Sequence, residues 1–340
     1  MPKTSSEQEF SEGGLTQIRV YEEVNRSVAN ISTRSYTRDP FFMIAEPQEG
    51  AGSGSILDKE GHIFTNCHVI DGAKFINVTL FDGSPYVAEV VGADPENDTA
   101  VLRIDAPAEE LFPVKFGESS GLRVGQKVMA IGNPFGLERT LSVGIVSALN
   151  RTLPGRVRGY IMKEIIQIDA ALNKGNSGGP LLSSQGLLIG MNTAIANPSR
   201  SGENTGVGFA IPVNTLRSVV PQLIRFGRVI RPDLGIVHTT QQKNGLRINK
   251  LTPDGPAAKA GLRGIRLTRK QVRQGRYILE YQTPDYEHAD EIVSIDGKKI
   301  NSYSQLQSIL ENYQPGQSVE IEFIREGKLK KVTVTLGEQR

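Results

Sequence analysis

The sequence predicts a mostly β chain that folds as two or three packed units. It has 340 residues, and at roughly 150 residues per domain this length is enough for several sizeable cores. Its 36 glycines and its hydrophobic content of 38% are typical of turn-rich β proteins. From Gly50 onward, short strand-like runs alternate with turn signals. We therefore expect small strands packed into layers or barrels rather than a helical bundle.

The N-terminal region is expected to be polar and disordered over residues 1–17, because it is rich in Ser, Glu and Gly. Apolar residues then recur at near-helical spacing from Ile18 to Ser32, which predicts a helix leading into the first strand. The sequence has no charged start followed by an apolar segment and no run of about 18 apolar residues. These features indicate either a cytoplasmic protein or one whose targeting segment is absent from this chain.

Two groups of strands are expected before residue 170. The first begins with a hairpin across Asp58–Gly61, and the second begins near Gly125. The strands of the first group are residues 52–58, 61–66, 75–80, 86–94 and 100–105, and those of the second are residues 127–132, 139–150 and 165–168.

A domain boundary is expected after residue 227. Apolar residues of Val213–Phe226 form a helical stripe that ends at Gly227, a residue type common at helix ends. We assign residues 18–227 to the first domain, 228–232 to a linker and 233–340 to the last domain. Within the last domain we expect a helix at residues 303–312 and closing strands at 319–325 and 331–336.

The most informative stretch is residues 173–181, Asn-Lys-Gly-Asn-Ser-Gly-Gly-Pro-Leu, in which Ser177 lies among glycines. A serine hydroxyl is a weak nucleophile, so it needs a base to take its proton and donors to hold the oxyanion formed on attack. Glycines leave room for a substrate carbonyl to approach the main chain. The amides of Gly175 and Ser177 are the candidate oxyanion donors.

A base and an orienting carboxylate are also available. His68 lies in Thr-Asn-Cys-His-Val-Ile, and Asp98 directly precedes the apolar run of residues 99–104. The gaps, 98 − 68 = 30 and 177 − 98 = 79 residues, leave room for several strands between the three residues. Each residue alone has an ordinary interpretation, as a packed histidine, a turn aspartate or a glycine-rich loop. Asp94 and Asp105 are alternatives to Asp98, but Asp98 is the residue that we select.

The order His, Asp, Ser is that of the chymotrypsin-like catalytic triad. At this point the chain resembles the HtrA/Deg family of trypsin-fold serine proteases that carry a C-terminal PDZ domain. Thr65–Ile70 resembles the family's histidine motif and Asp169–Leu181 its serine motif. Segments 190–195 and 206–212 resemble those that flank its specificity pocket. The resemblance covers about Ser27 to the C-terminus. It implies two chymotrypsin-like six-stranded β-barrels followed by an α+β PDZ domain.

The residues expected near the specificity pocket are Ala171, Asn192 and Ile195. In trypsin an aspartate six residues before the serine binds a basic P1 side chain, the residue on the acyl side of the scissile bond. Here 177 − 6 = 171, and position 171 is alanine. An arginine buried in this pocket would lack a partner, so we expect a preference for small to medium aliphatic P1 residues.

The C-terminal domain is expected to bind peptides. Asp233-Leu-Gly-Ile-Val resembles the carboxylate-binding loop and strand of a PDZ domain, and the amides of Leu234, Gly235 and Ile236 are the candidate donors to a peptide C-terminus. The chain departs from the family by an extra segment near residues 263–289. Its arginines and Lys270 at spacings of three and four predict one basic helical face. That face is either simply solvated or binds an acidic partner.

Further features are implied by the family. Its aromatic residues near the N-terminus pack protomers into trimers, and Tyr36, Phe41 and Phe42 are candidates here, with ordinary core packing as the alternative. A flexible loop at residues 151–160 corresponds to one that senses bound peptide, so Arg156 and Arg158 are candidate switch residues, with solvated arginines as the alternative. A homotrimer or a multiple of trimers and an extracytoplasmic location, in the periplasm or an organelle lumen, are the corresponding expectations.

Composition excludes few other functions. The net charge of +2 gives no indication of nucleic-acid binding. The four histidines are scattered and Cys67 is the single cysteine, so neither a metal site nor an intrachain disulfide is expected. We interpret Cys67 as a small packed thiol, with its side chain directed away from that of His68 if this segment ends a strand.

We expect an ATP-independent endopeptidase without a cofactor that degrades unfolded or damaged proteins. The alternative is a non-enzymatic chaperone or peptide-binding scaffold.

Overall fold

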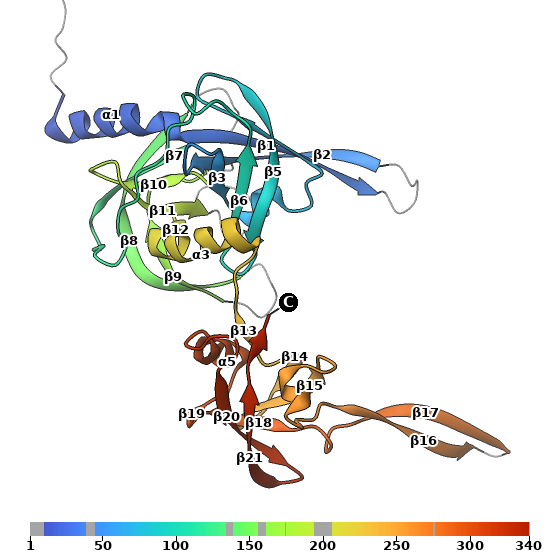
Figure 1. Ribbon diagram of the computed structural model, residues 1–340. Coiled ribbons are helices and arrows are strands. Elements are labelled where there is room, and N and C mark those ends of the chain that lie inside the picture. The colour runs from blue at the N-terminus through green and yellow to red at the C-terminus, as the bar shows by residue number, and fades with distance from the viewer. Residues whose placement is uncertain are drawn as a thin grey trace, which may run out of the picture. The chain divides into compact units, whose positions relative to one another are not determined.

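The computed structural model describes residues 10–38, 45–133, 139–155, 161–173, 175–193, 206–274 and 276–339 (Figure 1). The chain divides into two compact units, one ending at Val229 and the other beginning at Ile230. Ile195, Phe41, Phe42, Arg156 and Arg158, singled out from the sequence, lie outside the described residues. Within the described residues, no helix is both long and apolar enough to cross a membrane.

The first unit contains two closed six-stranded β-barrels, as the resemblance noted in the sequence implies. The first barrel has the strand order β1-β2-β3-β6-β5-β4 and the second the order β10-β11-β12-β9-β8-β7. The bounds are β1 Val28–Arg38, β2 Ala45–Ile56, β3 His62–Thr65, β4 Phe75–Thr79, β5 Pro85–Asp94 and β6 Thr99–Ile104, then β7 Lys127–Gly132, β8 Thr140–Pro154, β9 Ile161–Ile168, β10 Pro180–Ser183, β11 Leu188–Thr193 and β12 Gly208–Pro212.

The N-terminal helix differs from the sequence-based expectation. Helix α1 spans Glu12–Val24, so it begins inside the segment expected to be disordered. It starts there because the Ser11 hydroxyl accepts a hydrogen bond from the Gly14 amide at 3.1 Å and caps the first turn. After a short 3₁₀ turn (η1, Asn25–Ser27), residues 28–32 belong to β1 instead of the helix. Pairing of β1 with both β2 and β4 overrides the helical spacing there.

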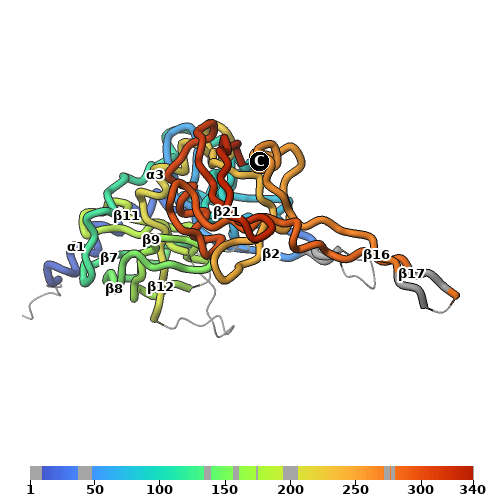
Figure 2. The backbone as a smooth tube through the Cα atoms, turned by 90° about the horizontal axis from the view of Figure 1, so that it is seen from below, coloured from blue at the N-terminus to red at the C-terminus, as the bar shows by residue number. Residues whose placement is uncertain are grey.

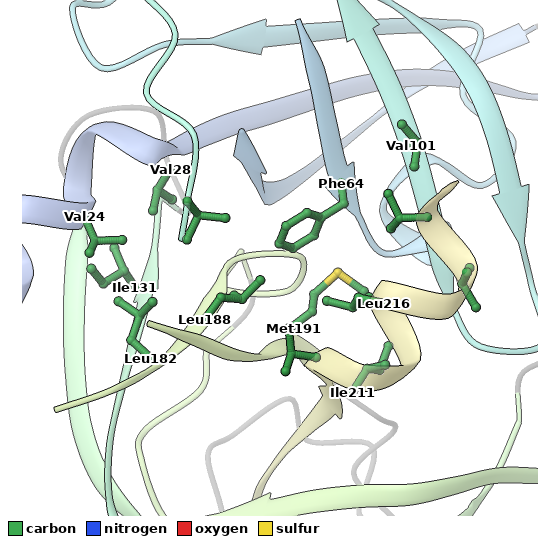
Figure 3. Close-up of a cluster of buried hydrophobic side chains, with 14 of the residues drawn as sticks. Val24, Val28, Phe64, Val101, Ile131, Leu182, Leu188, Met191, Ile211 and Leu216 are labelled. Atoms are coloured by element: carbon green, nitrogen blue, oxygen red, sulfur yellow. The ribbon is translucent and has the colours of Figure 1, made fainter. Parts of the chain in front are cut away.

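The main apolar core of the first unit lies between its two barrels (Figure 3). Phe64 and Val101 come from the first barrel, while Ile131, Leu188 and Met191 come from the second. Helix α3 (Val213–Phe226) covers this core with the stripe predicted from the sequence. It ends at Gly227, whose left-handed backbone (φ 72°) lets its amide bond the Leu223 carbonyl at 2.9 Å. The segments of the candidate active site described below follow or precede strands on both sides of this core.

The second unit is built on a six-stranded sheet. Five of its strands follow the order β14-β15-β18-β20-β21, with β14 at one edge, and β19 pairs with β18. Its core contains α5, which begins at Tyr303 as expected, and α4. The bounds are β13 Pro232–Asp233, β14 Ile236–Gln241, β15 Leu246–Leu251, α4 Pro256–Lys259, β16 Arg266–Gln274, β17 Tyr277–Asp285, β18 Glu291–Ile295, β19 Lys298–Lys299, α5 Tyr303–Leu310, β20 Ser318–Arg325, β21 Lys328–Thr335 and β22 Gly337–Glu338.

The extra basic segment is not helical. Strands β16 and β17 pair antiparallel over their whole length and run outward as a two-stranded arm of the second unit (Figure 2). Strand alternation, which places Arg269 and Lys270 on opposite faces, replaces the single basic face expected from helical spacing. Arg266 is held at the base of the arm by Asp285, with Nε 2.8 Å from the carboxylate.

Candidate active site

His68 and Asp98 form a close pair in the first barrel. His68 lies in the short helix α2 (Cys67–Ile70), which follows β3, and Asp98 lies in the turn between β5 and β6. His68 Nδ1 is 2.7 Å from Asp98 Oδ2, and the His68 amide donates to Asp98 Oδ1 at 3.0 Å. With Nδ1 bonded to the carboxylate, the ring presents Nε2 on its opposite side. This arrangement fixes both the orientation of the imidazole and the nitrogen left for chemistry.

Asp98 is held by several independent contacts. Its backbone is left-handed (φ 48°), a conformation that aspartate adopts more readily than most residues, and its side chain is 1% exposed. The Asp98 carbonyl accepts hydrogen bonds from the Cys67 amide at 3.2 Å and from Asn66 Nδ2 at 3.0 Å. Thr193 of the second barrel donates its hydroxyl to Asp98 Oδ2 at 3.0 Å. The carboxylate therefore joins the two barrels behind the histidine.

The serine-bearing segment is tightly folded and buried. Ser177 is 6% exposed, and Gly175 and Gly178 on either side of it have φ values of 101° and 85°. A Cβ on Gly178 would collide with the Ser53 carbonyl oxygen and with the Thr65 hydroxyl. Glycine is therefore required at 178 by both the backbone conformation and the approach of the first barrel.

Ser53 of β2 links the serine segment to the first barrel. Its Oγ donates to the Gly175 carbonyl at 2.6 Å and accepts from the Asn133 amide at 2.8 Å. Its own amide donates to the Ser177 carbonyl at 2.8 Å, and its carbonyl accepts from Thr65 Oγ1 at 2.7 Å. Ser53 is completely buried. One residue therefore holds Gly175 and Ser177 relative to the strand that leads to His68.

The sequence analysis did not identify Ser53 or Thr193. Ser53 has the same appearance in the sequence as Ser55, two residues later, since each follows a glycine. Thr193 follows Asn192 at the end of β11, and the sequence analysis assigned only Asn192 a role. Their roles depend on partners more than 90 residues away, at Asp98 and Gly175, and no local pattern contains that information.

The residues expected near the specificity pocket have different environments. Ala171 is exposed, and its neighbour Leu172 is half-buried. A Cβ built on Gly208 would lie 3.0 Å from both Leu172 Cδ1 and Ile168 Cγ1, so this region is lined by apolar atoms. Asn192 is completely buried, and its Nδ2 donates to the Pro180 carbonyl at 3.0 Å, behind the serine segment.

Cys67 lies in a helical turn, so the strand alternation considered for it does not apply. Its Sγ donates to the Thr99 carbonyl at 3.1 Å. Burial, followed by the nearby Asp98 charge, raises the pKa of the thiol to about 12. A thiol with this pKa is a poor nucleophile at neutral pH. Among the described residues, no group of three or more His, Cys, Asp or Glu side chains is arranged to hold a metal ion.

A second candidate site lies at the edge of the second unit. Leu234 and Gly235 directly precede the edge strand β14, which begins with Ile236. Gly235 has a φ of 72°, and its carbonyl accepts from the Thr252 amide at 2.8 Å, while the Leu234 carbonyl accepts from the Ala257 amide at 2.8 Å. These bonds fix the loop. An edge strand after a fixed loop can accept a peptide as an additional strand.

Family models match both units. A model described as a trypsin-like peptidase domain matches residues 52–191, and a model of the PDZ domain matches residues 232–336. The first match contains the segments that bear the histidine, the aspartate and the serine. The second contains the edge strand and its loop.

Relatives and solved structures extend over both units. The chain is 44% identical to Protease Do-like 1, chloroplastic, of Arabidopsis thaliana, over 95% of this chain and 72% of that protein. It is 38% identical to the periplasmic pH-dependent serine endoprotease DegQ of Escherichia coli, over 86% of this chain and 60% of that protein. The chain thus spans well under the full length of these relatives.

A solved structure of an HtrA-type protease, AlgWS227A with decapeptide, superposes with a TM-score of 0.77 at 31% identity, covering 95% of this chain and 98% of that chain. The crystal structure of the serine endoprotease from Yersinia pestis superposes with a TM-score of 0.65 at 30% identity, covering 95% and 98% of the two chains.

Proposed function

Since this chain belongs to the HtrA/Deg family of serine endoproteases, we propose that it cleaves polypeptides through a Ser177 acyl-enzyme. The observation that carries the proposal is the His68–Asp98 pair, with 2.7 Å between Nδ1 and Oδ2, next to the glycine-flanked Ser177 segment that Ser53 holds. A serine needs both a base and an oxyanion site, and these contacts supply the residues for both.

In the proposed first step, His68 Nε2 takes the Ser177 proton as Oγ bonds to the scissile carbonyl carbon. Asp98 keeps the ring in the required tautomer and stabilises the imidazolium that forms. The amides of Gly175 and Ser177 bind the oxyanion. His68 then gives the proton to the leaving amine as the C–N bond breaks, and water releases the acyl group by the same route in reverse.

A fluorophosphonate probe tests this chemistry because it reacts only with an activated serine. The full chain should be labelled, and Ser177→Ala should abolish the labelling. Ser184→Ala is a matched control, because Ser184 lies just after β10 and is only partly buried, and its carbonyl accepts a hydrogen bond from Arg19 at 3.0 Å, so labelling should persist. Absence of labelling in the folded, peptide-activated chain would instead favour a non-enzymatic peptide-binding scaffold.

For P1 we propose a small to medium aliphatic residue. Ala171 offers no charge to a basic side chain, and the region beside it is apolar at Leu172, Ile168 and Gly208. Burial of an unpaired guanidinium would cost several kcal/mol. Peptides that differ only at P1 should be cleaved faster with Val or Ala than with Lys or Arg, and the reverse order would contradict the proposal.

The second unit is proposed to bind peptide C-termini along β14, with the Leu234, Gly235 and Ile236 amides as donors to the carboxylate. Its support is the edge position of β14 and the fixed loop before it. In a binding titration, a peptide with a free C-terminus should bind and the same peptide with an amidated end should bind at least tenfold more weakly. Equal affinities would contradict this mode.

The remaining proposals concern assembly, substrates and compartment. Phe10, Leu15 and Ile18 on or beside α1 are exposed apolar residues and support association of protomers, which we propose to be trimers or multiples of trimers. Sedimentation would measure the mass of the assembly and so test this proposal.

The proposed substrates are unfolded or damaged proteins, which the chain would cleave without ATP. Digestion of casein in a nucleotide-free buffer would test this. The names of the relatives support an extracytoplasmic location, with a cytoplasmic one as the alternative.

A further inference from the structure

The arm formed by β16 and β17 has two strand edges that no other strand covers. The two strands pair with each other over all nine residues of each, and among the described residues neither has another strand beside it (Figure 1). A sheet of only two strands is marginally stable in water, and a third strand completes it. The free amides and carbonyls of such an edge can therefore pair with another extended chain.

The two edges of the arm differ in how well they suit a further strand. Strand β16 contains no proline or glycine, and its pairing with β17 has no register shift, so its backbone groups are regularly spaced. Strand β17 ends in Pro284 and Asp285, and the proline has no amide hydrogen to donate. The β16 edge is therefore the better template.

Strand β16 carries positive charge and no negative charge. Its sequence, Arg-Leu-Thr-Arg-Lys-Gln-Val-Arg-Gln, has four cations and no acidic residue. Arg266 is paired with Asp285. By contrast, Arg269 and Lys270 are exposed and have no ion-pair partner in the part of the chain that the structure describes. A carboxylate that lies beside these two residues would be attracted to both.

The two unpaired cations lie on opposite faces of the arm. Arg269 is opposite Gln282 and Lys270 is opposite Tyr281, and consecutive residues of a strand alternate between its faces. A flat surface such as a membrane would meet one face and only one of the two cations. A chain that lies along the β16 edge has side chains next to both, because its own residues alternate in the same way.

The arm of a second copy of this chain complements the β16 edge poorly. Two β16 strands side by side would bring the cations of both copies together, and like charges across a strand pair are destabilising. Strand β17 has only Glu280 as an acidic residue besides the paired Asp285. The charge therefore favours an acidic chain from outside the molecule.

We infer that the β16 edge binds an extended acidic segment of the substrate as a third strand. Main-chain hydrogen bonds hold the segment, and its carboxylates lie beside Arg269 and Lys270. An unfolded polypeptide, the proposed substrate, has the free amides and carbonyls that this pairing needs. The inference rests on the proposed function and adds a substrate feature, an acidic segment bound at residues other than the catalytic ones.

The first test measures binding of a labelled peptide made of Glu-Glu-Thr-Thr repeats, which places carboxylates on both faces of a strand. Its C-terminus is amidated so that it lacks the carboxylate proposed to bind at β14, and the full chain carries Ser177→Ala so that the peptide is not cleaved. Fluorescence anisotropy should show that replacing Glu by Gln weakens binding about tenfold. Methylation of the backbone amides keeps the charge but prevents strand pairing, so it should also weaken binding about tenfold.

Charge reversal on the arm tests the same contacts from the side of the protein. Arg269→Glu combined with Lys270→Glu should weaken binding of the Glu peptide at least about tenfold, since two attractions become repulsions. Both residues are exposed, so the thermal midpoint should not change. Lys298→Glu combined with Lys299→Glu is the matched control, because it changes the net charge equally at two exposed residues of β19, and the affinity should stay the same.

The second test asks whether the bound segment belongs to the substrate. Two internally quenched peptides share one cleavable sequence and carry either the Glu or the Gln segment, again with amidated ends. For the wild-type chain, KM should be about tenfold lower with the Glu segment and kcat should be equal, because this contact is the same in the bound substrate and in the transition state. In the Arg269→Glu and Lys270→Glu double variant the two KM values should be equal.

The possible results separate the inference from the proposed function. Equal affinities for the Glu and Gln peptides, or an affinity that the double variant leaves unchanged, would overturn the inference and leave the cations with a role in protecting the edge from aggregation. Binding to phosphatidylglycerol vesicles without binding of the Glu peptide would also overturn it, as would equal wild-type KM values. Fluorophosphonate labelling that persists in each of these cases leaves the proposed function standing. Peptide binding without labelling would refute the proposed function and the assignment of the segment to a substrate.

Discussion

The Ser53 hydroxyl offers the sharpest test of how the proposed oxyanion site is built. Ser53→Ala removes the bonds to the Gly175 carbonyl and the Asn133 amide, at 2.6 and 2.8 Å, and leaves both groups without that partner in a buried site. Each orphaned group costs about 1–3 kcal/mol, so the two together cost about 2–6 kcal/mol. We expect the Gly175 segment to move so that its carbonyl finds another hydrogen-bond donor, which would reduce this cost.

Movement of Gly175 should appear in catalysis, because the same residue carries the amide proposed to bind the oxyanion. Complete loss of one such donor costs about 10²–10³-fold in kcat, so a displaced donor should cost about 10–10²-fold. KM should change by less than about twofold, since the hydrogen bond from the Gly175 amide to the oxyanion stabilises the transition state more than the bound substrate. Steady-state kinetics on one peptide and the rate of fluorophosphonate labelling would measure both effects.

Ser55→Ala is the matched control. Ser55 lies on the same strand and is also completely buried, but its hydroxyl has no hydrogen-bond partner among the described residues. Its removal should leave kcat unchanged and leave the thermal midpoint equal or slightly higher. If Ser53→Ala keeps the wild-type kcat, or if Ser55→Ala loses as much activity, the argument that Ser53 positions Gly175 is refuted.

Three further predictions concern polar contacts between side chains. Thr193→Val deletes the hydroxyl that donates to the buried carboxylate of Asp98, and a hydrogen bond of this kind contributes about 1.5–3 kcal/mol. In peptide hydrolysis kcat should therefore fall at least about tenfold with KM unchanged. An unchanged kcat would show that the contact is dispensable. Arg325→Met leaves the carboxylate of Asp290, which is 0% exposed, without the guanidinium that lies 2.7 Å away. Urea unfolding should show that the free energy of unfolding of the second unit falls by about 3–5 kcal/mol, and a decrease below about 1 kcal/mol would contradict this. The hydrogen bond from the Tyr313 hydroxyl lowers the pKa of Asp296, so the ionised carboxylate stabilises the folded state above about pH 4, and this stabilisation is lost as the pH falls further. Thermal scans should show that Asp296→Asn loses less stability than the wild type between about pH 5 and about pH 2.5. Equal losses in the two proteins would contradict this prediction.

Local patterns in the sequence were sufficient for much of the fold. The turn at Asp58–Gly61 predicted the β2–β3 hairpin, in which Ser55 pairs with Phe64. The apolar stripe and Gly227 predicted α3 over its full length. These predictions depend on neighbours within a few residues, so the chain itself carries the information. Two predictions were wrong: that the first helix continues to Ser32, and that the extra basic segment is helical. In both places strand pairing overrode a helical spacing of side chains.

The residue types available for chemistry can be read directly from the sequence: a serine among glycines, a histidine and an aspartate, in an order that matches one known family. The contacts of Thr193 with Asp98 and of Ser53 with Gly175, and the cleft that Phe75 and Val87 line with that glycine, become visible only in the folded chain. They depend on distances between strands that are far apart in the chain. Barrel closure sets those distances, and no short stretch of residues encodes them.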